Sequence, residues 1–176
     1  MAHKVSKLYP NTSTEPYWTP QLVYETIITD IRVTCPINTL ARGVAKHSNH
    51  TTYRLFITHR PGKKVPYKGQ TEVKHSFHFW DVWALFNFKH IDVYKPTEED
   101  LKFRDLLRST YKNFIHTGKV LDKNISTGRD DNTQFPEKSI VLTNYKPWIE
   151  VVDGAIHKKQ CKFWKRHGFD KYGWHN

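Results

Sequence analysis

The residues best suited to chemistry in this sequence are its histidines, of which there are eleven among 176 residues. Two pairs, His47 with His50 and His75 with His78, have an i, i+3 spacing that would place both imidazoles on one face of a helix. A metal site needs further ligands in suitable geometry, and no zinc-finger or zinc-protease spacing supplies them. We therefore expect no metal and no cofactor, which leaves acid–base chemistry as the use to consider for these side chains.

A histidine acts as a general base in ester hydrolysis when a serine nucleophile and an orienting acid accompany it. One large hydrolase fold places that serine in Gly-x-Ser-x-Gly, at a sharp strand-to-helix turn. No serine of this chain has glycines at that spacing, and no phosphate-binding glycine loop is present. The sequence therefore offers a base but no nucleophile of this kind.

The segment that begins at His78 resembles the catalytic-histidine motif of type-B carboxylesterases. In that motif an acid follows the histidine at the third position, and an apolar stretch ends in phenylalanine. Asp81 and Phe86 stand at those offsets, and the match continues to Phe88. The residues that precede the family's histidine fit better at His75, which has His78 and not an acid at the third position after it. His78 is thus the preferred base, and His75 is the alternative.

Four further segments resemble the family and occur in its order. They are Asp30-x-x-x-x-Cys35-Pro36, Thr52-Tyr53-x-x-Phe56-x-x-His59-Arg60, the helical segment from Tyr111 to Gly118 with Tyr111 in place of tryptophan, and Cys161-Lys162-Phe163-Trp164. The matches cover about residues 8–169. The resemblance implies that residues 1–176 are the C-terminal portion of a carboxylesterase type-B domain, with an incomplete α/β-hydrolase sheet and flanking helices.

This resemblance also implies roles for individual residues. Because the family's triad runs serine, acid, histidine along the chain, a C-terminal portion holds only the histidine. His78 would then be the general base of a serine ester hydrolase that acts on a small-molecule ester, and the segment would be inactive by itself. Asp81 would fix the local loop and would not serve as the triad acid. Cys35 and Cys161 would form a disulfide.

Two other interpretations remain open. Cholinesterase-like adhesion proteins keep the fold, lose the triad and bind protein partners. A truncated, non-functional product would lack the central strands and expose a sheet edge, which predicts aggregation.

Charge and compartment signals restrict the partners. The net charge is +11, yet no nucleic-acid-binding motif accompanies the basic residues, so we expect a solvated basic surface and no nucleic-acid partner. No apolar run is long enough to span a membrane. Sequons at Asn11, Asn49 and Asn124, with an even cysteine count, favour the secretory pathway and glycosylation. No signal peptide is visible at the N-terminus, which a portion cut from a longer precursor would explain.

Hydrophobic patterns predict a mixed α/β arrangement. We expect helices over 20–30, 39–47, 97–116 and about 156–168, and strands over 52–58, 140–142 and 148–152. Residues 8–20 and 119–138 have the composition of extended or loop segments.

Overall fold

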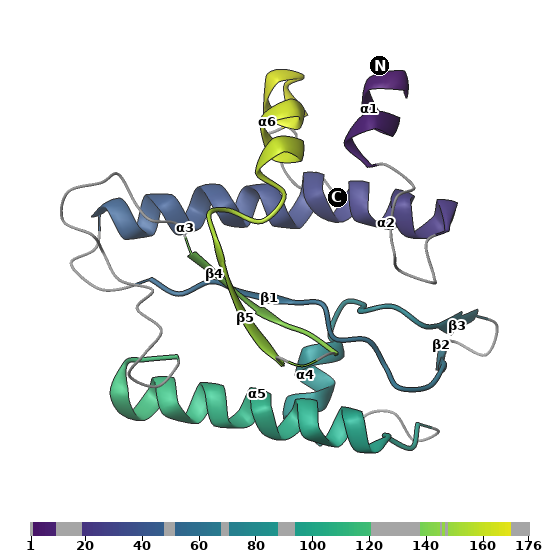
Figure 1. The fold of residues 1–176 in the computed structure, drawn as a ribbon, viewed down its shortest axis with the longest axis vertical. Helices are drawn as coiled ribbons and strands as arrows, with labels where there is room; N and C mark the ends of the chain where they lie inside the picture. Colours follow the sequence, from purple (N-terminus) through teal and green to yellow (C-terminus); the bar gives the residue numbers. More distant parts are fainter. Residues whose placement is uncertain are drawn as a thin grey trace. The chain divides into compact units, whose positions relative to one another are not determined.

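The computed structural model describes residues 2–9, 19–47, 52–67, 71–87, 94–120, 138–144, 146 and 148–169. They belong to two compact units, one formed by Met1–Thr52 with Gly154–Asn176 and the other by Tyr53–Asp153. The first unit is helical, and the second combines strands with two helices (Figure 1). The protein is therefore of the mixed α/β class. None of the helices described combines the length and apolarity that a membrane crossing requires.

Among its described residues, the helical unit has five helical segments: α1 (Ala2–Leu8), α2 (Pro20–Thr29), the π-helical turn η1 (Asp30–Thr34), α3 (Cys35–His47) and α6 (Lys158–Arg166). The Thr19 side chain caps α2 by accepting a hydrogen bond from the Leu22 backbone N–H at 3.1 Å. Pro20 occupies the first position of this helix, where the missing N–H costs nothing. The helix predicted over 20–30 is thus confirmed, and helical structure continues beyond residue 30.

The α2, η1 and α3 segments form one long helix, whereas the sequence predicted two separate ones. Pro36 has no N–H to donate and its ring crowds the preceding turn, so a regular α-helix would be broken at this point. The π turn accommodates it: the Cys35 N–H reaches back five residues to the Asp30 carbonyl. The prediction that the second helix starts at 39 was wrong, because the π turn lets helical structure continue through Pro36.

Two small sheets belong to the second unit. One has the strand order β1-β4-β5, from β1 (Leu55–Ile57), β4 (Lys138–Leu142) and β5 (Ile149–Asp153). The β1 and β4 strands are parallel, with Leu55 opposite Ile140, and β5 runs antiparallel to β4. The other sheet is a hairpin of β2 (Val65–Tyr67) and β3 (Thr71–Val73). The predicted strands are confirmed in place, although the strand expected over 52–58 is shorter; the hairpin was not predicted.

In the part of this unit that the structure describes, the helices are α4 (Trp80–Leu85) and α5 (Glu98–Thr117). Both ends of α5 match the sequence prediction. Thr97 and Asp100 form a reciprocal capping box at the start, and Gly118 ends the helix with a left-handed φ of 70°. Six residues are too few for a helical periodicity to be recognised, which explains why α4 was missed.

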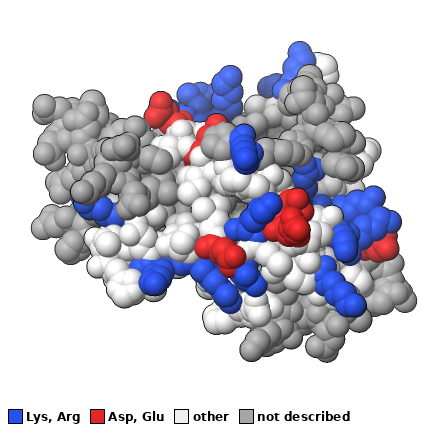
Figure 2. All heavy atoms as spheres, turned by 60° about the horizontal axis from the view of Figure 1, so that its bottom comes forward, with Lys and Arg blue, Asp and Glu red and all other residues white. Residues whose placement is uncertain are grey.

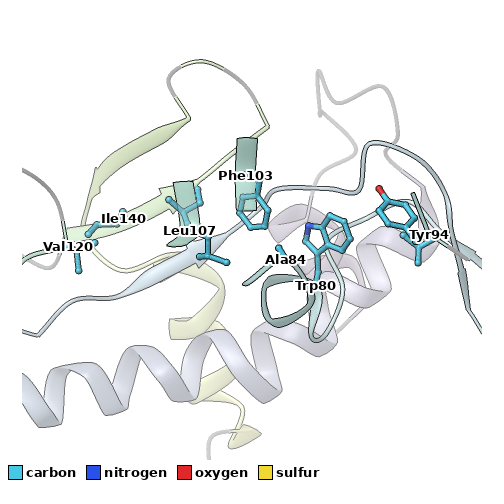
Figure 3. Close-up of a cluster of buried hydrophobic side chains, with 9 residues drawn as sticks. Trp80, Ala84, Tyr94, Phe103, Leu107, Val120 and Ile140 are labelled. Carbon is cyan, nitrogen blue, oxygen red and sulfur yellow. The ribbon is translucent and has the colours of Figure 1, made fainter. Parts of the chain in front are cut away.

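A cluster of buried apolar side chains holds the second unit together (Figure 3). Its fully buried members include Trp80 and Ala84 from α4, Phe103 and Leu107 from α5, and Ile140 from β4. Because these residues come from segments far apart in sequence, their packing fixes α4 and α5 against the sheet. The start of α4 is thereby positioned, and that is where the candidate histidines lie.

Candidate functional site

The loop that carries His75 and His78 lies at the carboxyl end of β1. The Ser76 hydroxyl donates a long hydrogen bond of 3.4 Å to the carbonyl oxygen of Ile57, the last residue of that strand. Since β1 pairs in parallel with β4, this is the end of the strands at which α/β proteins usually bind ligands. The local topology thus places both histidines at an edge suited to function.

His78 and Phe79 are exposed, whereas the aromatic residues on either side of them, Phe77 and Trp80, pack inward. Phe77 packs against Trp80 and Trp83, with ring centroids 5.5 and 5.2 Å apart. Trp80 is fully buried. His78 and Phe79 therefore form an outward turn between anchored neighbours, and their rings meet edge to face at 4.3 Å.

The turn depends on an unusual backbone conformation at Phe79. Its φ is 71°, in the left-handed region that bulky side chains rarely adopt. The Phe79 carbonyl accepts the Trp83 N–H at 2.8 Å, and so it starts the first hydrogen-bonded turn of α4. Strained residues of this kind persist where the surrounding packing determines the path of the chain, and they cluster at functional sites.

The other predicted site residues are placed as follows. Asp81 lies in the first turn of α4, where a carboxylate complements the helix dipole, and it makes no hydrogen bond to the loop among the residues that the structure describes. Among these described residues, His78 accepts no hydrogen bond and forms no ion pair with an acidic side chain. Asn11, Asn49, Asn124 and Phe88 lie outside the described residues. The second half of the His47–His50 pair lies outside them too.

His59 is a buried histidine whose role the sequence did not predict. Its ring stacks on Phe103 with centroids 4.0 Å apart, and its Nδ1 accepts a hydrogen bond from the Trp80 indole N–H at 3.2 Å. Because indole only donates, Nδ1 must be unprotonated, and the neutral ring carries its proton on Nε2. Burial lowers the pKa of His59 to about 4. This histidine is therefore a structural anchor that ties α4 to the end of β1, and not a base.

Asp100 is a second buried anchor near the site. Its carboxylate accepts hydrogen bonds from the Tyr94 hydroxyl at 2.6 Å, the Thr97 N–H at 2.7 Å, the Thr97 hydroxyl at 2.9 Å and the Gly62 N–H at 2.9 Å. Burial, followed by the Asp100 hydrogen bond, raises the pKa of the Tyr94 hydroxyl well above its usual range. One carboxylate thus caps α5 and fixes the turn that precedes β2.

A cavity of about 270 Å³ lies between β1 and the second half of α5. It is lined by Tyr53, Leu55, Thr110, Tyr111, Phe114 and Val120. Burial raises the pKa of the Tyr111 hydroxyl, and the nearby Asp81 charge adds to the effect. Neither His75 nor His78 lines this cavity, so it is not a substrate pocket for the candidate base.

In the helical unit, Cys35 and Cys161 form the disulfide that the resemblance implied. Such bonds persist in oxidising compartments, so the protein fits a location outside the cytosol. Beside it, the fully buried Asp30 accepts hydrogen bonds from the Tyr9 hydroxyl at 2.7 Å and from His157 Nδ1 at 2.6 Å. Only the spacing of Asp30 from Cys35 was noticed in the sequence, and nothing there indicated either partner.

Neither a family model nor a curated protein matches the chain significantly. Among the described residues, no group of three or more His, Cys, Asp or Glu side chains is placed to hold a metal ion. The functional assignment therefore depends on the histidine turn and its surroundings.

Proposed function

We propose that this chain supplies the histidine base of a serine carboxylic-ester hydrolase of the α/β-hydrolase type, whose nucleophile lies outside these 176 residues. The observation that carries the proposal is the position of His78: it is exposed, on a turn beside the carboxyl end of a parallel strand. A base that takes a proton from a serine needs this exposure, because substrate and nucleophile must both reach its ring.

The anchoring of the turn supports the same function. Catalytic geometry tolerates little displacement, and residues that hold a site are themselves held by packing. Here the Trp80 indole donates a hydrogen bond to His59, and Phe77 packs against the Trp80 ring. With an ester hydrolase of this family, secretion or residence in the endoplasmic reticulum would agree with the Cys35–Cys161 disulfide.

Reconstitution with a serine-bearing hydrolase portion tests the proposal. The chain alone should hydrolyse nitrophenyl acetate only at a trace rate, since the nucleophile and the oxyanion donors are elsewhere. Joined to a matching portion that carries Gly-x-Ser-x-Gly, it should turn the ester over. His78→Ala should then reduce turnover at least about a thousandfold, because loss of a triad member leaves only residual catalysis.

His75→Ala and His116→Ala are the matched controls, and each should change turnover by less than about tenfold. If His75→Ala is the inactive variant, the base is assigned three residues too late. If none of the three substitutions affects a functional enzyme, this chain does not supply the base, and a non-catalytic adhesion protein becomes the better description.

A further inference from the structure

The basic residues of α6 gather on one face of the helix. At 100° per residue, Lys158, Lys159, Lys162, Lys165 and Arg166 fall within an arc of about 120°. All five are exposed, and no apolar or acidic side chain lies within the arc. None of the five forms an ion pair with another residue in the part of the chain that the structure describes. The arc is referred to below as the α6 cationic face.

Contacts on the opposite side hold this face in place. The Cys35–Cys161 disulfide joins α6 to α3. The Trp164 indole N–H donates to the Tyr9 hydroxyl at 2.8 Å, and the Gln160 amide donates to the Leu8 carbonyl at 3.1 Å. These bonds set α1 beside α6 (Figure 1), which adds two exposed lysines, Lys4 and Lys7, to the same pair of helices.

Little negative charge in the helical unit balances these lysines. Its acidic residues in the described ranges are Glu25 and Asp30, and Asp30 is fully buried with Tyr9 and His157 as partners. Elsewhere the charges are mixed: Lys64 pairs with Glu72 and Arg104 with Asp105. Figure 2 shows acidic side chains lying among the basic ones on the face it draws. Those paired residues leave no excess of positive charge like that of the α6 cationic face.

We propose that the α6 cationic face binds a linear sulfated polysaccharide of the heparin class. Closely spaced cations on a fixed helix match a chain of closely spaced sulfates, and each contact releases counterions from the polyanion. The disulfide that fixes α6 persists in the oxidising compartments where such polysaccharides occur. This inference does not depend on the proposed esterase function, since it uses none of the residues near His78.

Two other polyanionic partners fit the surface less well. Single-stranded nucleic acids usually stack their bases on exposed aromatic rings, whereas Trp164 is buried on the opposite side of α6. An anionic membrane is normally bound by a helix that also inserts apolar side chains from the same surface, and the arc contains none. A polysaccharide with sulfate groups requires neither feature.

Titration of the full chain with a heparin oligosaccharide tests the proposal. Lys158→Ala/Lys162→Ala/Lys165→Ala should weaken binding at least about tenfold. Binding of the wild-type chain should itself weaken as the salt concentration is raised. The matched control removes three exposed lysines of the other unit, as Lys102→Ala/Lys112→Ala/Lys119→Ala. This control lowers the net charge by the same amount but leaves the α6 cationic face intact. It should therefore weaken binding less than about threefold.

Equal losses in the two triple variants would show that overall charge, and not the α6 cationic face, attracts heparin. Equal affinity for desulfated heparin would overturn the role of sulfate. Tighter binding to single-stranded DNA, or to vesicles of equal parts phosphatidylcholine and phosphatidylserine, would replace the polysaccharide with that partner. Circular dichroism of both variants ensures that a loss of binding is not a loss of fold.

Discussion

Replacing Asp100 with alanine tests the claim that one buried carboxylate organises the histidine-bearing unit. Asp100 is fully buried and accepts four hydrogen bonds, two of them from Thr97, the N-cap residue of α5. Alanine would leave the Tyr94 hydroxyl and the backbone N–H groups of Thr97 and Gly62 without their acceptor.

The magnitude follows from these bonds. A hydrogen bond to a charged acceptor contributes about 1.5–3 kcal/mol net, and bonds that share one acceptor are not additive. We therefore expect Asp100→Ala to lower the free energy of unfolding by about 4 kcal/mol, a large part of the total for a small domain. The assay is urea unfolding followed by tryptophan fluorescence, which reports on the buried Trp80.

Asp105→Ala is the matched control on the same helix. Asp105 is exposed and pairs with Arg104, so its removal should leave the urea midpoint nearly unchanged. Asp100→Asn keeps one acceptor oxygen and should give an intermediate loss. Similar midpoints for Asp100→Ala and Asp105→Ala would refute the reasoning, since the four hydrogen bonds would then contribute nothing measurable.

Two further predictions concern acid and redox conditions. The pKa of His59 falls from 6.5 in the unfolded chain to about 4 in the fold. This group therefore does not reduce the free energy of unfolding above pH 6.5, and it lowers that free energy by about 3 kcal/mol in total as the pH falls toward 4. Urea midpoints measured across that range should show the decrease, and His59→Phe should flatten it; an unchanged slope would mean that other groups cause it. Cys35→Ser/Cys161→Ser should cost up to about 5 kcal/mol, because the bond closes a sequence separation of 126 residues in the unfolded chain. Reduced wild-type protein should unfold at the same urea concentration as this variant, and a variant as stable as the oxidised protein would contradict the closure argument.

Local signals in the sequence were sufficient for several elements. The Thr97–Asp100 pair and Gly118 set the limits of α5, because capping is decided by residues three or four apart. The apolar, β-branched segments gave the positions of β1, β4 and β5 for a similar reason. The pairing of Cys35 with Cys161 was implied by resemblance alone, and the structure confirms it.

What the tertiary structure decided is which polar groups are buried and with whom. The sequence does not distinguish His59, which is buried and neutral, from His78, which is exposed three residues after another histidine. It could not reveal that Asp30 joins Tyr9 and His157, since those partners lie 21 and 127 residues away. Nor could it show that Pro36 continues a helix through a π turn. Burial and long-range pairing depend on how distant segments pack, and only the folded chain determines that packing.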